Sequence, residues 1–200
     1  MGIPVLILGE SGSGKSCSLR NFEPGEVGIF NVAGKPLPFR KKLPQANNAD
    51  YRIIMATLAR HNLNTYVIDD SQYLLCFDMF GRAKETGYNK FTDLALNFYN
   101  LIQLVIKSTP PDCIVYFLHH TENVDGKTKA KTIGKMLDEK LTVEGLFSIV
   151  LLCTTDGINH EFITQSDGNT TAKSPMEMFP LKMENDLKAV DAAIREYYEL

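Results

Sequence analysis

The chain has 200 residues, of which 44% are apolar and 22% are charged, proportions typical of a folded protein with a hydrophobic core. These proportions exclude intrinsic disorder, and no apolar run approaches the roughly 18 residues of a membrane helix. The first residues, MGIPVLILGE, lack the basic region and cleavage site of a signal peptide. The four cysteines show no CxxC spacing, so we expect reduced thiols and a cytoplasmic location.

Charge is unevenly distributed along the chain, although the net charge is only −3. Residues 1–140 contain 17 Lys and Arg against 14 Asp and Glu, whereas residues 141–200 contain 4 against 10. The stretches 35–42 and 127–135 contain basic residues and no acidic ones. Such patches can bind a polyanion even on an acidic protein. The alternative is that both are solvated loops.

The order of predicted elements indicates the fold class. Short apolar runs predict strands over 3–8, 27–32, 65–68, 113–118, 147–153 and 160–164. Helices are predicted over 15–21, 50–61, 71–86, 91–107 and 183–200, the last with Asn185 or Asp186 as N-cap. This alternation is typical of a mainly parallel α/β sheet flanked by helices. Asp156-Gly157 predicts an antiparallel hairpin near the C-terminal end. We expect one domain over 1–200.

The strongest motif is a phosphate-binding loop, since residues 9–16 read GESGSGKS and match GxxxxGK[ST]. An apolar strand precedes the loop and a predicted helix follows it. Glycines allow the backbone N–H groups of such a loop to point at phosphate oxygens. Lys15 is expected to contact the β- and γ-phosphates of ATP, and the Ser16 hydroxyl to bind Mg²⁺. The expected nucleotide-binding residues are Gly9, Ser11, Gly12, Ser13, Gly14, Lys15, Ser16 and Cys17. Cys17 is also expected to be a small buried residue of the first helix.

Two carboxylates follow the third predicted strand, which reads TYVI and is continued by Asp69 and Asp70. Ligands of open α/β sheets bind at the carboxyl ends of the strands. Asp69 is our candidate for holding Mg²⁺ through water, and Asp70 for polarising the attacking water as a general base. Alternatively, Asp70 is the N-cap of the helix that begins at Ser71. Glu10, within the loop, is a rival candidate for positioning water.

Polar residues also follow the fourth predicted strand, where IVYFL leads into His119 and His120. Adjacent strand residues point to opposite faces, so only one of the two can face the site. We favour His120 as a sensor of the γ-phosphate. A buried, hydrogen-bonded histidine is the alternative. The predicted catalytic set is therefore Lys15, Asp70, Glu10 and His120.

Several segments together resemble a family of phage-encoded RecA-like proteins, which are AAA-type P-loop nucleotide-binding proteins. They read GESGSGKS, VIDD, YFLHHTE, KTIGKMLDEKLTVEGLFSIVL and FITQSDGNTTAKSPMEMF. The resemblance covers almost the whole chain, from Val5 to Tyr198. Some members of the family are short RecA-core proteins that act as single-strand annealing recombinases.

The resemblance implies a RecA-like core that binds ATP and Mg²⁺ and acts on single-stranded DNA. It also implies a role in phage DNA replication or recombination in the cytoplasm of the bacterial host. One departure concerns the second predicted strand, 28–32, which ends without the glutamate that activates water in RecA itself. Hydrolysis then depends on Asp70 or Glu10, or is slow.

The resemblance also places DNA on two regions, 81–92 and 121–137. The candidate contacts are Arg82, Lys84 and Lys90 in the first region, and Lys127, Lys129 and Lys131 in the second. Lys173, or alternatively Lys129 or Lys131, is a candidate basic finger reaching a neighbouring subunit. Such a finger implies a homo-oligomer, as a ring or filament, and a single-strand-binding protein is a further candidate partner.

Two other functions remain open from the sequence. A nucleotide-dependent switch that recruits replication proteins would share every motif and lack DNA affinity. A small-molecule kinase would need an arginine-rich lid, but none of the six arginines cluster after the fourth predicted strand.

Overall fold

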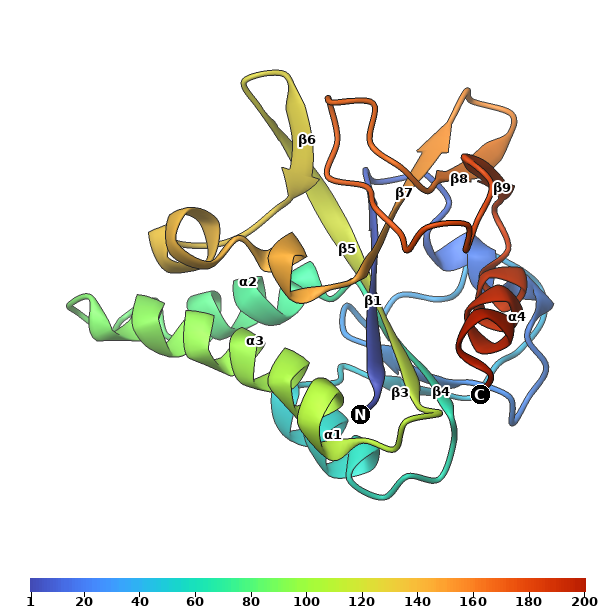
Figure 1. Ribbon diagram of the computed structural model, residues 1–200. Coiled ribbons are helices and arrows are strands. Elements are labelled where there is room, and N and C mark those ends of the chain that lie inside the picture. The colour runs from blue at the N-terminus through green and yellow to red at the C-terminus, as the bar shows by residue number, and fades with distance from the viewer.

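Nine strands form one mixed sheet in the computed structural model, which describes residues 1–200 (Figure 1). The strands are β1 (Ile3–Gly9), β2 (Gly28–Asn31), β3 (Gln45–Asn47), β4 (Thr65–Asp69), β5 (Ile114–Val124), β6 (Lys127–Ala130), β7 (Ile149–Thr155), β8 (His160–Ile163) and β9 (Lys182–Glu184). Their order is β3-β2-β4-β5-β1-β7-β8-β9, and β6 pairs with β5. Neighbours from β3 to β7 are parallel, whereas β8, β9 and β6 add antiparallel pairs. The expected parallel α/β sheet with a C-terminal antiparallel hairpin is confirmed.

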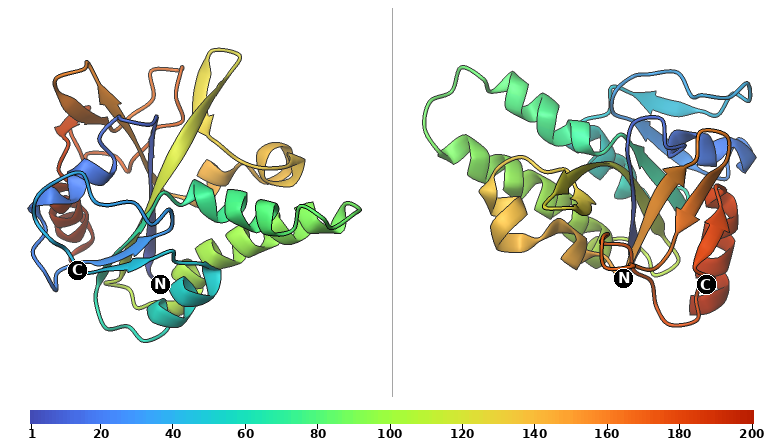
Figure 2. Two further views of the ribbon diagram at one scale, coloured as in Figure 1. Left: turned by 180° about the vertical axis from the view of Figure 1, so that it is seen from behind. Right: turned by 90° about the horizontal axis from the view of Figure 1, so that it is seen from above.

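Helices flank the sheet on both faces (Figures 1 and 2). They are α1 (Tyr51–Leu58), α2 (Gln72–Gly81), α3 (Asn89–Ser108) and α4 (Leu187–Tyr198), with the short 3-10 helices η1 (Ser16–Asn21) and η3 (Val143–Leu146) and a π-helical turn η2 (Met136–Leu141). None of these helices combines the length and the apolar character needed to cross a lipid bilayer.

Alternation of side chains along β1 builds two hydrophobic cores. Leu6 and Leu8 belong to a core that is completed by residues of α1, α2 and α3. Val5 and Ile7 point to the other face, where they join a core with η1 and α4. Because successive strand residues face opposite sides, a strand buried on both faces must be apolar throughout. This requirement explains the continuous apolar run that predicted β1.

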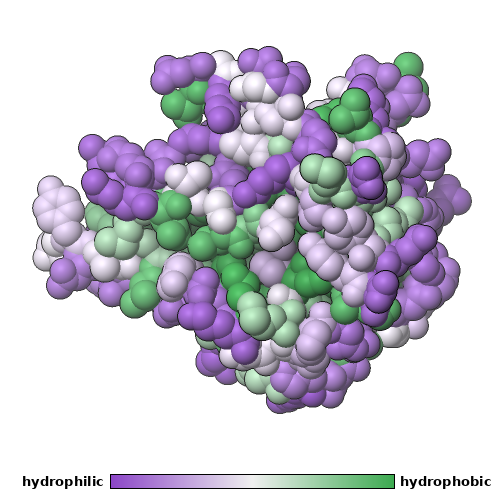
Figure 3. Space-filling view, in the orientation of Figure 1, coloured by the Kyte–Doolittle hydropathy of each residue, from purple (hydrophilic) through white to green (hydrophobic).

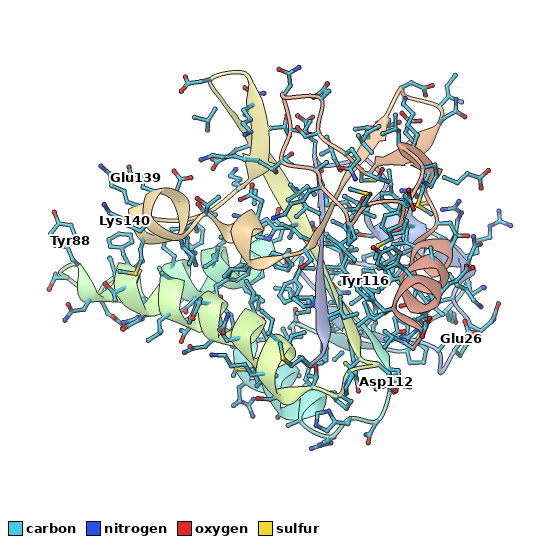
Figure 4. All side chains as sticks on the ribbon, viewed as in Figure 1. Glu26, Tyr88, Asp112, Tyr116, Glu139 and Lys140 are labelled. Atoms are coloured by element: carbon cyan, nitrogen blue, oxygen red, sulfur yellow. The ribbon has the colours of Figure 1, made fainter.

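Helix α4 is tied to the sheet by a buried carboxylate. Asp186 caps the helix by accepting from the backbone N–H groups of its first turn, as expected for an N-cap. Asp191 accepts hydrogen bonds from Tyr116 Oη at 2.9 Å and from Arg195 Nε at 2.7 Å. Figure 4 shows Tyr116 in the centre of the molecule, between the sheet and α4. The final helix therefore packs on the sheet.

The structure differs from the sequence predictions in several local features. The predicted helix 15–21 is a 3-10 helix over Ser16–Asn21. The candidate DNA region 121–137 contains the β5–β6 hairpin, whose turn at Asp125 and Gly126 has φ values of 52° and 81°. An Asp-Gly pair with both φ values positive is the favoured chemistry of a two-residue hairpin turn. Strands β3 and β9 were not predicted, and each has only three residues.

Candidate functional site

The predicted phosphate-binding loop, residues 9–16, emerges from the carboxyl end of β1, at the upper edge of the sheet in Figure 1. Lys15 is buried and its Nζ donates to Gly9 O at 2.7 Å and to Glu10 O at 2.8 Å. An ammonium group has three N–H donors, so one remains for a ligand. Burial lowers the pKa of Lys15, although nearby Asp70 and Asp69 oppose that effect. The loop thus holds a cation at its centre.

Backbone donors of the loop have the pattern that anion binding requires. The N–H groups of Gly12, Gly14, Lys15 and Ser16 donate to no acceptor within the chain. Gly12 and Gly14 have φ values of 83° and 103°, which L side chains rarely adopt. Unpaired backbone donors in a turn of this kind form an anion-binding concavity. These donors fit the oxygens of a phosphate chain.

Ser16 connects the loop to the acidic strand end. Its Oγ donates to Asp69 Oδ1 at 2.8 Å, although the two residues are 53 positions apart. Burial raises the pKa of Asp69 to about 6, while the hydrogen bond from Ser16 acts in the opposite direction. A hydroxyl and a carboxylate side by side, next to a place for phosphates, are the protein ligands that Mg²⁺ takes in phosphate sites.

Asp70 lies at the centre of a small ionic cluster. Its carboxylate accepts from Lys35 Nζ at 2.9 Å and from His120 Nε2 at 3.1 Å. Burial alone would raise the pKa of Asp70, but these two hydrogen bonds outweigh it and lower the pKa to about 2. The alternative that Asp70 caps the following helix is wrong, because its side chain is turned to Lys35 and His120. Its φ of 61° is a left-handed conformation that costs free energy in a residue other than glycine.

The two adjacent histidines have different roles, as the alternation along β5 predicts. His120 lines the pocket beside Asp70. His119 is fully buried, donates from Nε2 to Lys131 O at 2.9 Å, and accepts at Nδ1 from Ser71 Oγ at 2.9 Å. Burial lowers the pKa of His119 to about 4. His119 is therefore the buried, hydrogen-bonded histidine, and His120 is the one available to a ligand.

A pocket of about 380 Å³, which we call the phosphate pocket, brings these groups together. It is lined by residues of the loop, by Asp69, Asp70 and His120, and by Lys35 and His160. Cys17 also lines it and is only partly buried, contrary to expectation. Glu10 is exposed and does not line it, so the geometry favours Asp70 over Glu10 near the phosphates.

Sequence reasoning did not assign Lys35 or His160 to this site. Lys35 is positioned by Asn31 at the end of β2, whose Nδ2 donates to Lys35 O at 2.6 Å. In the sequence, the basic stretch 35–42 after that strand was the feature that could have indicated a cation at this site. His160 begins β8 and donates from Nδ1 to Ser13 O at 2.7 Å. A Cβ added to Gly14 would lie 2.8 Å from the same nitrogen, so only glycine fits beneath this ring.

The predicted DNA contacts divide into paired and free cations. In region 81–92, Arg82 forms ion pairs with Glu85 and Asp93, both at 2.7 Å, and Lys90 Nζ donates to Glu85 O. Lys84 is exposed and forms no ion pair within the chain. Figure 4 shows Tyr88 of this region at the outer end of the α2–α3 pair, which projects away from the β5–β6 hairpin. The two regions come together only beyond the hairpin, where Gly134 lies close to Phe91.

On the β5–β6 hairpin, Lys129 is paired with Asp138 and lies 3.7 Å from Glu122. Lys127 and Lys131 are exposed and have no acidic partner. Lys131 is also bonded to the site, because its backbone N–H donates to His120 O at 2.9 Å and its carbonyl accepts from His119. The hairpin is thus connected to both histidines at the edge of the sheet.

The candidate finger Lys173 lies in a segment that bridges β7. Its backbone exchanges two hydrogen bonds of 2.8 Å with Val150, and its side chain is partly exposed.

No protein-family model matches the chain, and no curated protein is significantly similar to it.

Proposed function

We propose that the chain is a RecA-like P-loop protein that binds ATP together with Mg²⁺. The main support is the set of four free backbone donors in the loop, at Gly12, Gly14, Lys15 and Ser16, next to the buried Lys15 ammonium. A phosphate chain supplies the acceptors that these donors lack. The adjacent strands β4, β5 and β1 bring the acidic, histidine-bearing and loop-bearing ends to one edge, which supports a RecA-like core.

Ser16 and Asp69 fit Mg²⁺ in the presence of a nucleotide. No group of three or more His, Cys, Asp or Glu side chains is placed to hold a metal ion by itself. In phosphate sites Mg²⁺ takes one or two protein ligands and completes its shell with water and phosphate oxygens. When bound, the ion would neutralise negative charge on the phosphates.

Hydrolysis in this site is expected to be slow. A carboxylate with a pKa of about 2 that already accepts two hydrogen bonds is a weak proton acceptor, so Asp70 is better suited to hold Lys35 and His120 in place. Of these two side chains, Lys35 keeps N–H donors that can reach the terminal phosphate, because its ammonium has three and one bonds Asp70. We therefore propose nucleotide binding as the main activity of the site, with slow hydrolysis of the bound ATP.

A second part of the proposal is that bound ATP controls single-stranded DNA on the β5–β6 hairpin. It is supported by the exposed, unpaired Lys127 and Lys131 and by the hydrogen bonds that join Lys131 to His119 and His120. A change at His120 on phosphate binding would reach the hairpin through these bonds. With the resemblance to phage RecA-like proteins, this supports a role in annealing or recombination by a ring or filament of subunits.

Calorimetric titration with Mg–ATP tests the nucleotide site. Lys15→Met keeps the buried volume of the side chain and removes its charge. We expect at least a tenfold loss of affinity, since a charge-assisted contact is worth about 1.5–3 kcal/mol. Lys107→Ala, at an exposed position on α3, is the control. Equal binding by Lys15→Met and the parent protein would refute the site.

Fluorescence anisotropy of a labelled single-stranded oligonucleotide tests the DNA part. The double variant Lys127→Ala with Lys131→Ala should weaken binding. It should also reduce the slope of log K against log salt concentration by about 0.7 for each lost phosphate contact. The double variant Lys42→Ala with Lys107→Ala removes the same charge elsewhere. If ATP binds normally and no DNA binds in any nucleotide state, the switch that recruits a protein replaces the DNA function.

A further inference from the structure

A second pocket continues from the phosphate pocket along the same edge of the sheet. It has a volume of about 620 Å³, and it shares Cys17 and His160 with the phosphate pocket. Its other lining residues come mainly from the β7–β8 turn, from β9 and from η1. We call it the outer pocket. A ligand can therefore extend from one pocket into the other past Cys17 and His160.

The strand order fixes the direction in which a nucleotide would lie. From β4 to β8 the sheet runs β4-β5-β1-β7-β8, so Asp70, His120, the phosphate-binding loop and His160 follow one another along the edge. The ionic cluster of Lys35, Asp70 and His120 closes the end at β4 and β5. The remaining N–H donors of Lys35 suit the terminal phosphate, which bears the most negative charge. The rest of the nucleotide must then leave at the β8 end.

We propose that the outer pocket holds the nucleoside of the bound nucleotide and that the β7–β8 turn packs against its base. This inference rests on the proposed nucleotide site and adds the recognition of the nucleoside. Ile158, Asn159 and His160 would then make the site bind a nucleoside triphosphate more tightly than inorganic polyphosphate.

The turn is held by hydrogen bonds to Asp156 and presents an apolar side chain to solvent. Asp156 Oδ1 accepts from the backbone N–H groups of Ile158 at 2.8 Å and Asn159 at 2.7 Å, and Oδ2 accepts from Asn159 Nδ2 at 3.0 Å. Ile158 is 86% exposed although it lines the outer pocket. A fixed, exposed isoleucine beside a pocket gains free energy when a planar base covers it. Holding the turn in advance reduces the entropic cost of that contact.

His160 can recognise the nucleoside with its free ring nitrogen. Nδ1 donates to Ser13 O, so in the neutral ring Nε2 is an acceptor, and it has no partner within the chain. The amide oxygen of Asn159 is likewise free, because its amide nitrogen is the group bonded to Asp156. Two acceptors beside the outer pocket suit hydroxyl or amino donors of a nucleoside.

The chain contains no tryptophan, which allows a direct test. Ile158→Trp places a single fluorophore on the β7–β8 turn without disturbing the core, because position 158 is exposed. Tyr88→Trp places one at the outer end of the α2–α3 pair and serves as the control (Figure 4). Each variant is titrated with Mg–ATP and with Mg–tripolyphosphate, and binding of both ligands is measured independently by calorimetry.

We expect both ligands to bind, and Trp emission at position 158 to change with ATP alone, while the control stays unchanged. Ile158→Ala should weaken ATP binding about fivefold, the effect of losing a few buried methyl and methylene groups, and leave tripolyphosphate binding unaffected. Bound ATP with no emission change, or equal changes with both ligands, would overturn the outer pocket as the nucleoside site. If neither Mg–ATP nor Mg–tripolyphosphate binds, the phosphate site itself is wrong.

Discussion

Ser16 Oγ donates a hydrogen bond of 2.8 Å to Asp69 Oδ1 and so joins the phosphate-binding loop to the end of β4. Strand β5 lies between β1 and β4 in the sheet, so this contact spans two strand spacings. It places a hydroxyl and a buried carboxylate where an ion bridging them to a phosphate would be held. The proposed Mg²⁺ site depends on this pair.

Ser16→Ala should remove the dependence of ATP binding on Mg²⁺. Without the hydroxyl the ion loses a direct ligand, and the affinity for Mg–ATP should fall about tenfold, while binding without Mg²⁺ stays unchanged. Calorimetry with Mg²⁺ or with a chelator measures both values. Ser108→Ala, at an exposed position, is the control. A variant that keeps its full response to Mg²⁺ would exclude Ser16 as a ligand.

The affinity for Mg–ATP should decrease between pH 7 and pH 5. The pKa of Asp69 is raised to about 6, so its carboxylate becomes protonated as the pH falls through that value and no longer attracts the ion. Asp69→Asn should bind Mg–ATP more weakly and with a flatter pH profile. Because ATP itself also takes up protons in this range, the comparison between the two proteins is decisive. Parallel profiles would contradict the assignment.

Asp70→Asn should reduce ATP turnover by less than about 100-fold. A true general base contributes about 10²–10⁴-fold, but the low pKa of Asp70, about 2, makes it a weak one. Its main effect is on Lys35 and His120, which lose their shared partner. Steady-state phosphate release measures the change, and circular dichroism verifies the fold. A loss of 10³-fold or more would establish Asp70 as the base.

Acid should destabilise the fold through His119. Its pKa in the folded state is about 4, below the ordinary value of 6.5, so the unfolded chain takes up the proton first. Stability present at pH 7 is therefore lost as the pH falls from 6.5 towards 4, by up to about 3 kcal/mol. Urea unfolding of the parent protein and of His119→Gln measures this effect. His61→Asn, on an exposed loop, should keep the parent profile; the same profile for His119→Gln would contradict the account.

Much of the fold was predictable because its central strands are buried on both faces and therefore apolar, as in β1 and in residues 114–118 of β5. The missed strands β3 and β9 have three residues each and lie at the sheet's two edges, where the apolar signal is weak. The β5–β6 hairpin was missed because its lysines suggested a loop, although Asp125-Gly126 marked the turn. Figure 3 is consistent with this, since hydrophilic side chains predominate at the tips of the upper hairpins.

Within the site, residues near the motif in sequence were predictable and those brought by the fold were not. Lys15, Ser16 and Asp69 follow from local patterns. Lys35 reaches the phosphate pocket because β2 ends at the edge of that pocket, and His160 reaches it because β8 begins there. No spacing in the sequence indicates that His160 covers Gly14. Asp70 shows the same limit, because its partners Lys35 and His120 are 35 and 50 positions away.

Amide chemical shifts of the loop show whether phosphate oxygens occupy it. In a ¹⁵N-labelled sample titrated with Mg–ATP, the resonances of Gly12, Gly14, Lys15 and Ser16 should shift together and saturate at one nucleotide per chain, because phosphate oxygens then accept from donors that are free in the protein alone. Shifts confined to other parts of the chain, or none at saturating nucleotide, would exclude the loop as the nucleotide-binding site.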